Sequence, residues 1–365
     1  MGLKCGIVGM PNVGKSTLFN CLSNAGALAA NYPFATIEPN VGMVNVPDER
    51  LDKLTDLVKP QRVVPTTVEI VDIAGLVAGA SKGEGLGNQF LGNIRDTNAI
   101  VHVVRCFTDD NVVHVSGSVN PVRDKEIIDI ELQLKDLESV EKKMQRLEKL
   151  LKSNDKEAKR GLEVLEIYRL HLEAGKSARS APVEEDDRRF IADINLLTAK
   201  PVLYVCNVDE NSALNGNEHT AAFIEAVKDE NAEVIILCAA LESDIMQLET
   251  YEERLEFLEA MGLQEPGISK LIHACYKLLS LITYFTAGEK EVRAWTIKKG
   301  TKAPGAAGEI HSDFEKGFIR AEVIAYNDYI KHGSEHACRE NGKLRVEGKE
   351  YIVADGDIMH FRFNV

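Results

Sequence analysis

The chain has 365 residues, of which 44% are hydrophobic and 27% are charged, and this balance is typical of a water-soluble globular protein with room for two or three domains. Its formal net charge of −14 argues against DNA binding, and it has neither a long apolar run nor a basic-plus-apolar leader, which argues against a membrane or secreted protein. Seven cysteines without a C-x-x-C pair favour reduced thiols, so we expect a cytoplasmic location and no zinc site.

The first motif is a phosphate-binding loop at residues 9–17, which read Gly-Met-Pro-Asn-Val-Gly-Lys-Ser-Thr and fit G-x-x-x-x-G-K-[ST]. It follows an apolar run at 5–8, which predicts a buried strand, and it precedes a predicted helix. In this context backbone amides surround a phosphate chain, Lys15 reaches the terminal phosphates and the Ser16 hydroxyl binds Mg²⁺. The sequence therefore predicts a nucleoside triphosphate site. The expected loop contacts are Asn12, Val13, Gly14, Lys15, Ser16 and Thr17.

Two further segments carry residues that accompany such a loop. Residues 68–75 form a predicted strand that ends in D-x-x-G, where Asp72 would hold Mg²⁺ through a water and the Gly75 amide would meet the γ-phosphate. Thr36, in the loop at 32–40, is the expected second hydroxyl ligand, although a loop threonine taken alone is usually just solvated. The predicted metal ligands are thus Ser16, Thr36 and Asp72.

The residue that would orient an attacking water is missing from its usual place. Many GTPases carry Gln directly after D-x-x-G, whereas this chain has Leu76. Hydrolysis should therefore be slow, or another polar group must act. Our candidate is His114, in a loop that follows the predicted strand 99–105 near the ligand edge of the sheet, although a lone loop histidine is more often structural.

Short apolar runs alternate with helical segments from residue 1 to about 115 and again from 201 to 238. The strand candidates are 3–8, 42–46, 67–72, 99–105, 201–207 and 233–238. This alternation predicts an α/β fold with a doubly wound, mostly parallel sheet that binds ligands at the carboxyl ends of its strands. We expect a nucleotide-binding domain in two parts, residues 1–128 and 199–280.

The residues between these two parts, 129–198, are charge-dense and almost free of glycine and proline. Apolar residues recur at alternating spacings of three and four from Leu137 to Leu151, and a second apolar stripe starts at Leu162. A third helix, at 186–197, would lead back towards the sheet. The pattern predicts an inserted antiparallel, coiled-coil-like helical arm, with an ordinary packed helical subdomain as the alternative.

The predicted strand 201–207 ends in Asn-Val-Asp-Glu, where GTPases carry N-K-x-D. The aspartate of that motif accepts two hydrogen bonds from guanine, whereas this chain places the longer Glu210 there and replaces the lysine with Val208. Residue chemistry alone leaves adenine and guanine open, because a mismatched polar contact costs only about 1–3 kcal/mol. The predicted base contacts are Asn207, Val208, Glu210 and, after the next strand, Ala239.

Residues 281–365 contain short β-like runs linked by glycine-rich turns, which predicts a small, separate α+β domain. Its 13 basic and 13 acidic residues balance, so the acidity of the chain lies elsewhere. Trp295 beside Lys298 and Lys299 forms a modest basic and aromatic patch. Such clusters are often solvated surface, so the patch alone does not establish RNA contact.

The motifs at 9–17, 31–42 and 72–75 together resemble those of the Obg family of P-loop (TRAFAC-class) NTPases. The tract at 88–96, the helical arm and the C-terminal module are similar to the YchF / Obg-like ATPase subfamily, and the likeness spans nearly the whole chain. Residues 281–365 resemble the TGS domain of that family, which has a ubiquitin-like fold.

The resemblance implies ATP as the substrate in preference to GTP, because this subfamily shows N-x-x-E where GTPases show N-K-x-D. It also supports His114 as a catalytic residue beside Lys15, and it implies binding to the large ribosomal subunit, with rRNA contacts from the TGS domain and the arm. We therefore expect a slow, Mg²⁺-dependent ATPase that acts as a switch on the ribosome. The alternatives are an Obg-type GTPase and a ribosome-binding protein in which hydrolysis has little consequence.

Overall fold

The computed structural model describes residues 3–28, 41–73, 86–109, 111–112, 114, 117–150, 155–248 and 250–364. Two predicted site residues, Thr36 and Gly75, lie outside these ranges, as does Leu76. The chain divides into two compact units: Met1–Gly42 with Glu69–Leu271, and Met43–Val68 with Ile272–Val365. We describe each unit by itself. None of the described helices is both long and apolar enough to span a bilayer.

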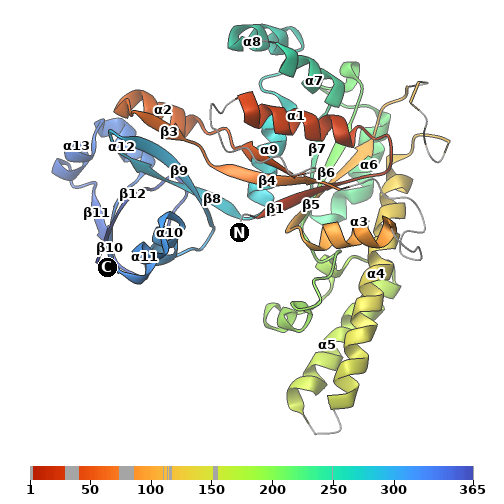
Figure 1. Ribbon diagram of the computed structural model, residues 1–365. Coiled ribbons are helices and arrows are strands. Elements are labelled where there is room, and N and C mark those ends of the chain that lie inside the picture. The colour runs from red at the N-terminus through yellow and green to blue at the C-terminus, as the bar shows by residue number, and fades with distance from the viewer. Residues whose placement is uncertain are drawn as a thin grey trace. The chain divides into compact units, whose positions relative to one another are not determined.

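A six-stranded sheet forms the centre of the first unit (Figure 1). Its order is β2 (Val41–Asn45), β4 (Thr67–Asp72), β1 (Lys4–Val8), β5 (Ala99–Arg105), β6 (Val202–Asn207) and β7 (Glu233–Leu237). The strands from β4 to β7 in this order are parallel, so their carboxyl ends meet at one edge. Every residue of β5 and β6 is buried, as the unbroken apolar runs predict for strands that are covered on both faces.

Helices cover both faces of this sheet. The helices connected to it are α1 (Lys15–Leu28), α3 (Leu86–Arg95), α6 (Glu218–Val227), α7 (Ala239–Gln247), α8 (Tyr251–Ala260) and α9 (Gly267–Leu278). In Figure 1, α1 and α7 lie above the sheet and α3 lies below it. Leu18 and Leu22, one turn apart on α1, are buried, which is the apolar stripe expected of a helix that covers a sheet. The predicted doubly wound arrangement is confirmed.

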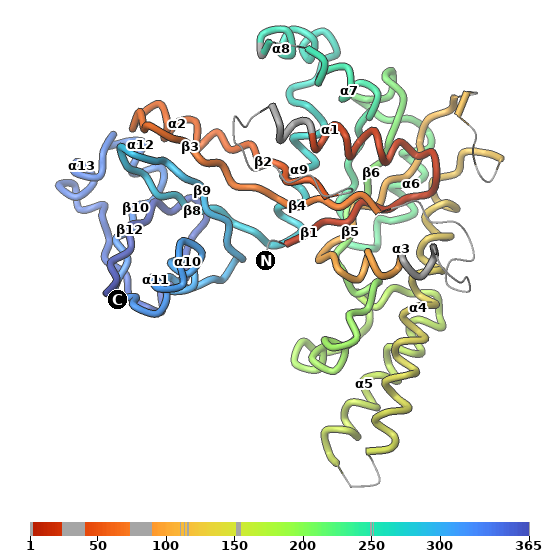
Figure 2. The backbone as a smooth tube through the Cα atoms, in the orientation of Figure 1, coloured from red at the N-terminus to blue at the C-terminus, as the bar shows by residue number. Residues whose placement is uncertain are grey.

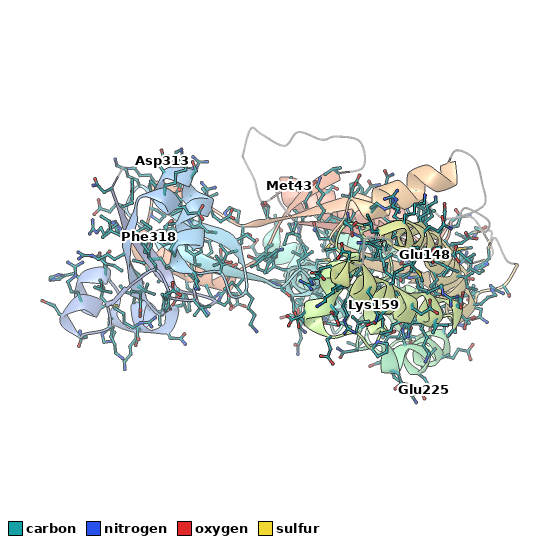
Figure 3. All side chains as sticks on the ribbon, turned by 90° about the horizontal axis from the view of Figure 1, so that it is seen from below. Met43, Glu148, Lys159, Glu225, Asp313 and Phe318 are labelled. Carbon is teal, nitrogen blue, oxygen red and sulfur yellow. The ribbon has the colours of Figure 1, made fainter. Side chains whose placement is uncertain are left out.

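The predicted helical hairpin consists of α4 (Pro121–Leu150) and α5 (Lys156–Glu173), which run side by side in opposite directions (Figure 2). Val140 on α4 packs with Leu165 and Tyr168 on α5. The exposed Glu148 and Lys159, one from each helix, mark the distal part of the hairpin in Figure 3. Helix α4 begins eight residues before position 129, the predicted start of the arm, and its first half is buried on one side.

The third helix predicted at 186–197 is wrong. The segment forms a short 3-10 helix, Glu185–Ile191, followed by turns. The Asp136 carboxylate on α4 accepts hydrogen bonds of 2.7 Å from the backbone amides of Leu197 and Thr198, so these amides are not available to a continuing helix.

The second unit contains another six-stranded sheet. Its order is β11 (Arg345–Glu347), β10 (Phe318–Ile324), β12 (Ile358–Phe363), β8 (Leu281–Ala287), β9 (Glu291–Lys298) and β3 (Arg62–Val64). Helix α10 (Ala303–Ile310) contributes three buried alanines to a hydrophobic core cluster that it shares with residues of this sheet. The remaining helices are α11 (Ser312–Lys316), α12 (Tyr326–His332) and α13 (Glu335–Glu340).

Residues 43–68 pack with the C-terminal residues, whereas the sequence placed them in the first part of the nucleotide-binding domain. Strand β3 pairs in parallel with β9, with Arg62 opposite Glu291. Helix α2 (Glu49–Val58) buries Leu51 and Leu54 in a cluster with residues of β8, β9 and β12. Helix α2 and strand β3 therefore pack with the hydrophobic core of the second unit, although they precede most of the first unit in sequence.

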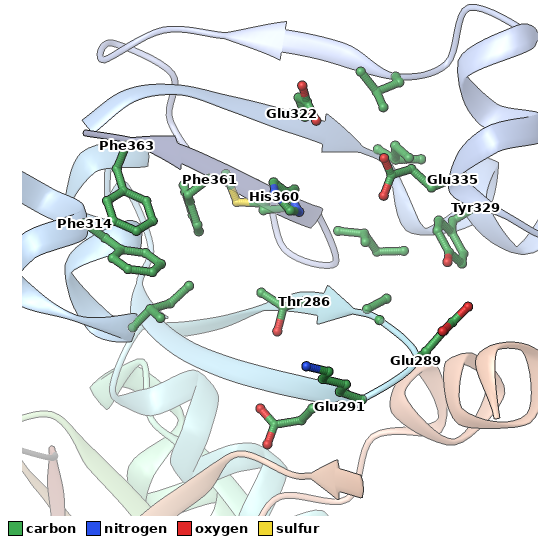
Figure 4. Close-up of a pocket in the computed structure, with 18 residues that line it drawn as sticks. Thr286, Glu289, Glu291, Phe314, Glu322, Tyr329, Glu335, His360, Phe361 and Phe363 are labelled. Atoms are coloured by element: carbon green, nitrogen blue, oxygen red, sulfur yellow. The ribbon is translucent and has the colours of Figure 1, made fainter. Parts of the chain in front are cut away.

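A cavity of about 700 Å³ lies in the second unit between β8 and β12 (Figure 4). Within the described residues these two strands pair at a single position, Ile358 opposite Phe285. Phe314 and Phe363 stack at one end of the cavity, with ring centroids 3.7 Å apart. Four glutamates and one lysine contribute the charged part of its lining: Glu289, Glu291, Glu322, Glu335 and Lys290.

Candidate nucleotide-binding site

The loop between β1 and α1 has the backbone shape that its sequence predicts. Asn12 and Gly14 adopt positive φ angles of 64° and 89°. A Cβ atom on Gly14 would lie 2.2 Å from Nδ2 of Asn207, so only glycine fits at this position. Helix α1 begins directly after this turn, at Lys15, and its unpaired N-terminal amides form the kind of site that binds phosphate.

A cleft of about 860 Å³ lies at the carboxyl edge of the parallel strands, where four loops meet. These are the β1–α1 loop, the segment after β5, the segment after β6 and the start of α7. The lining residues are Met10, Pro11, Asn12, Gly14, Lys15, Ser16, Thr17, Phe107, Thr108, Asp109, Val112, Asn207, Val208, Asp209, Glu210, Asn211, Cys238, Ala239 and Ala240. Nine of the twelve described site residues predicted from the sequence therefore line one cleft, and the three that do not are Val13, Asp72 and His114.

Asn207, at the end of β6, joins two of these loops. Its Nδ2 donates to the Val13 carbonyl at 2.9 Å, and its Oδ1 accepts from the Ala239 amide at 2.9 Å. The side chain is only 4% exposed. Asn207 therefore holds the phosphate-binding loop against the start of α7, and Val13, which is buried, contributes to the site through its backbone.

The two carboxylates after Asn207 have different roles. Asp209 accepts hydrogen bonds from the amide and hydroxyl of Ser212, at 3.1 and 3.0 Å, and so caps a short 3-10 helix, Glu210–Ser212. Glu210 is exposed in the cleft, and its carboxylate has no hydrogen-bond or ion-pair partner among the described residues. The acceptor available to a bound base is therefore Glu210.

Cys238 closes the cleft beside these carboxylates. Its Sγ accepts from the Leu241 amide at 3.5 Å at the start of α7. Burial, together with the nearby charges of Glu210 and Asp209, raises the pKa of the Cys238 thiol, so this side chain is neutral near pH 7. We therefore assign Cys238 a packing role and no reactivity.

Lys15 and Asp72 form an ion pair at the floor of the phosphate-binding loop. Lys15 is 8% exposed, whereas Ser16 and Thr17 are exposed to the cleft. The Ser16 hydroxyl and the Asp72 carboxylate are hard oxygen donors, the ligand type that Mg²⁺ prefers. No group of three or more His, Cys, Asp and Glu residues that could hold a metal occurs in the described part of the chain. The donors thus fit a magnesium ion that is held mainly by nucleotide phosphates.

His114 is not among the residues that line the cleft, although Val112, two positions earlier, is. Its Nε2 lies 2.9 Å from Oδ2 of Asp124 on α4. Asp124 is 1% exposed and also pairs with Arg123, at 3.2 Å. The structure therefore places His114 next to the cleft wall and brings Lys15, Asp72 and the base-side residues together without it.

Phe107, Thr108 and Asp109 form a wall of the cleft that was not predicted from the sequence. These residues directly follow β5, so their position at the carboxyl edge of a predicted parallel strand was the available signal. They contain no recognisable motif.

The cavity in the second unit does not suit a nucleotide. Its lining has four glutamates and one lysine, a composition that repels phosphate. The cleft around the phosphate-binding loop is therefore the candidate functional site.

Comparison with known proteins agrees with this geometry. Residues 4–156 match a family described as a 50S ribosome-binding GTPase. Residues 281–364 match the YchF-GTPase C-terminal family, described as a protein of unknown function. Over its full length the chain is 57% identical to the ribosome-binding ATPase YchF of Bacillus subtilis and 56% identical to that of Escherichia coli O157:H7, with all of each relative covered.

A solved structure, the YchF GTPase of Schizosaccharomyces pombe, has the same fold. It superposes with a TM-score of 0.90 at 42% identity, and the match covers 99% of this chain and 98% of that one. The similarity therefore extends to both units.

Proposed function

This chain belongs to the YchF family, and from that membership we propose that it is a Mg²⁺-dependent ATPase that binds the ribosome. The observation that carries the proposal is the meeting of Lys15, Ser16 and Glu210 in one cleft. The loop around Lys15 suits a polyphosphate, and Glu210 offers an acceptor to a base at the other end.

ATP is the preferred nucleotide in this proposal. The exocyclic amine of adenine donates to one acceptor, and Glu210 supplies one that is free of other partners in the described chain. Asp209, the shorter carboxylate, is already engaged by Ser212. The S. pombe relative is named a GTPase. The second candidate function is therefore that of a GTPase in which Glu210 accepts hydrogen bonds from guanine.

Within the cleft each residue has a proposed task. The Lys15 ammonium, once separated from Asp72, would stabilise charge on the terminal phosphates. Ser16, Thr36 and Asp72 would hold the metal, and the Gly75 amide would meet the γ-phosphate. Bound Mg²⁺ would neutralise phosphate charge. His114 would orient the attacking water, and turnover is slow because Leu76 cannot do so.

The test is a calorimetric titration of the full chain with ATP and with GTP in one magnesium buffer. We expect tighter binding of ATP, and no binding by Lys15→Ala. Tighter binding of GTP would replace the ATPase assignment with that of a GTPase. If neither nucleotide bound, the proposal would be wrong.

Ribosome binding is the second part of the proposal, and we assign it to the large subunit. The relatives are named ribosome-binding ATPases, and the N-terminal family is described as binding 50S ribosomes. We propose that residues 281–365 are a TGS domain, which the β8–β9 hairpin followed by α10 and β10 supports. This domain, through Trp295 and Lys298, and the helical arm 129–198 would contact rRNA or ribosomal protein.

Co-sedimentation tests this part. The full chain is mixed with whole ribosomes or with separated subunits, in ATP, ADP or no nucleotide. We expect binding to the large subunit that depends on the nucleotide. Equal binding in all three conditions would support the alternative in which hydrolysis has little consequence, and the absence of binding would contradict the proposal.

A further inference from the structure

Arg105 is the last residue of β5, and it is buried directly behind a wall of the nucleotide cleft. Its guanidinium donates to three backbone carbonyls of the following loop: Nε to Phe107 at 3.1 Å, Nη1 to Val112 at 3.0 Å and Nη2 to Asp109 at 3.2 Å. The guanidinium carbon also lies 4.5 Å from the centroid of the Phe107 ring. The side chain is 2% exposed.

This arrangement is unusual for a buried charge. Buried arginines are normally paired with carboxylates, because an unpaired charge is costly to desolvate. In the described part of the chain Arg105 has no carboxylate partner, and its acceptors there are all carbonyl oxygens of one loop. The planar five-donor fork of arginine suits this task, since a lysine cannot reach three divergent acceptors at once.

The loop that Arg105 holds forms part of the nucleotide site. Phe107, Asp109 and Val112 all line the cleft, and they are also the residues whose carbonyls receive the three hydrogen bonds. The loop also has two hydrogen bonds of its own, from the Val112 amide to the Asp109 carbonyl at 3.1 Å and from the Asn111 amide to Oδ1 of Asp109 at 2.9 Å. The bonds from Arg105 tie the loop to the end of β5, so without them it would be held less firmly in place.

We infer that Arg105 is a positioning residue of the nucleotide cleft, which fixes the wall formed by Phe107, Asp109 and Val112 and places a buried positive charge behind it. The inference rests on the proposed function, because it takes this cleft as the ATP site. Arg105 acts through the loop and does not touch the nucleotide. Its loss should therefore weaken nucleotide binding and loosen the loop while the sheet stays folded.

The test uses the full chain with three variants. Arg105→Lys keeps the charge but loses the fork, Arg105→Ala loses both, and Arg179→Lys is the matched control. Arg179 is also a mostly buried arginine of the first unit, but it bonds Glu230 at 3.0 Å and lies outside the cleft lining. Thermal unfolding of each variant establishes that it is folded, and calorimetry gives its affinity for ATP.

We expect ATP affinity to fall about tenfold in Arg105→Lys and further in Arg105→Ala, with little change in the control. Hydrogen exchange should quicken at the amides of 107–112 and stay unchanged in the P-loop helix α1. Millimolar guanidinium, but not urea at the same concentration, should restore part of the affinity of Arg105→Ala. If Arg105→Ala does not fold, Arg105→Lys and its hydrogen exchange decide the question.

Native affinity and native exchange in Arg105→Lys would overturn the inference, as would an equal loss of affinity in Arg179→Lys. Failure of the proposed function is distinguishable, because in that case the unmodified chain itself would not bind ATP.

Discussion

Asn207 donates a hydrogen bond to the backbone of Val13 in the phosphate-binding loop, with 2.9 Å between the side-chain Nδ2 and the carbonyl oxygen. The two residues are far apart in sequence, and this bond fixes the phosphate-binding loop to the loop expected to read the base. The same amide accepts from Ala239 through its oxygen, so three loops share one side chain. Gly14 is required here because a Cβ would collide with Asn207.

Asn207→Asp should weaken ATP binding about tenfold or more and lower stability by about 1–3 kcal/mol, because it replaces the donor with an oxygen that faces the Val13 carbonyl. Calorimetry and denaturant unfolding measure the two effects. Asn217→Asp is the matched control, since Asn217 donates to the Cys106 carbonyl at 2.7 Å but lies outside the cleft lining. An equal loss of affinity in both variants would contradict a specific role for Asn207.

Glu210→Ala should move the ratio of ATP to GTP affinity towards one. Loss of a hydrogen bond to the adenine amine costs about 1–3 kcal/mol, which corresponds to one to two decades of affinity. GTP binding should fall less, because the native side chain is not matched to guanine. Titrations with both nucleotides measure the ratio, and Glu218→Ala on α6 is the control. A loss of affinity that is greater for GTP than for ATP would instead show that Glu210 accepts hydrogen bonds from guanine.

Asp72→Asn should reduce the gain in ATP affinity that Mg²⁺ provides, by about ten- to hundredfold, because the carboxylate would hold the ion through a water. Without Mg²⁺ the variant should bind ATP at least as well as the native chain, since Lys15 is then released from its ion pair. Magnesium titrations at fixed ATP measure this. Glu69→Gln, on the same strand and paired with Lys4 at 2.5 Å, is the control and should leave the magnesium dependence unchanged.

The sequence predicted that the residues of the candidate site would lie close together, because they belong to local motifs. Residues 9–17 fix a backbone turn through two glycines, and parallel strands bring Asp72 and Asn207 to the same edge without any need to know the packing. The motif order therefore sufficed to bring Lys15, Glu210 and Ala239 into one cleft.

What the sequence did not predict depends on contacts between distant segments. Strand β3 is only three residues long, and its pairing with β9 follows from the burial of α2 in the second unit, which no local pattern reveals. Similarly, the Asp136 carboxylate accepts hydrogen bonds from the amides of Leu197 and Thr198, but in the sequence Asp136 looks the same as its exposed neighbours. The position of His114 in a loop after a parallel strand suggests a catalytic role. Its contact with Asp124, however, depends on how α4 packs, which the sequence does not reveal.

His102 should make the protein sensitive to acid. It is buried in β5, its Nε2 has no hydrogen-bond partner among the described residues, and burial, helped by the charges of Lys125 and Arg179, lowers its pKa from 6.5 to about 3. As the pH falls below 6.5, His102 binds a proton in the unfolded chain but not in the folded chain. The free energy of unfolding therefore decreases between about pH 6.5 and 3.

The expected loss from His102 is about 2 kcal/mol between pH 7 and pH 5. Denaturant unfolding at the two pH values measures it. His102→Gln should remove this part of the pH dependence, whereas His273→Gln, at an exposed site on α9, should keep it. Equal pH dependence in the native chain and His102→Gln would mean that folding does not lower the pKa of His102.

His114→Ala should lower ATP turnover about hundredfold and leave ATP affinity unchanged, because a group that orients water acts on the chemical step alone. In the structure the ring contacts Asp124 and lies outside the cleft lining, so it must turn towards the cleft during the reaction. Asp124→Asn weakens this contact by removing the carboxylate charge, so it should leave turnover equal to or above the native rate.

Single-turnover hydrolysis and calorimetry measure turnover and ATP affinity, with His219→Ala on α6 as the control. If His114→Ala hydrolyses ATP at the native rate, the water is oriented by another group. A fall in Asp124→Asn as large as that in His114→Ala would instead show that the ring works from its present position, held by Asp124.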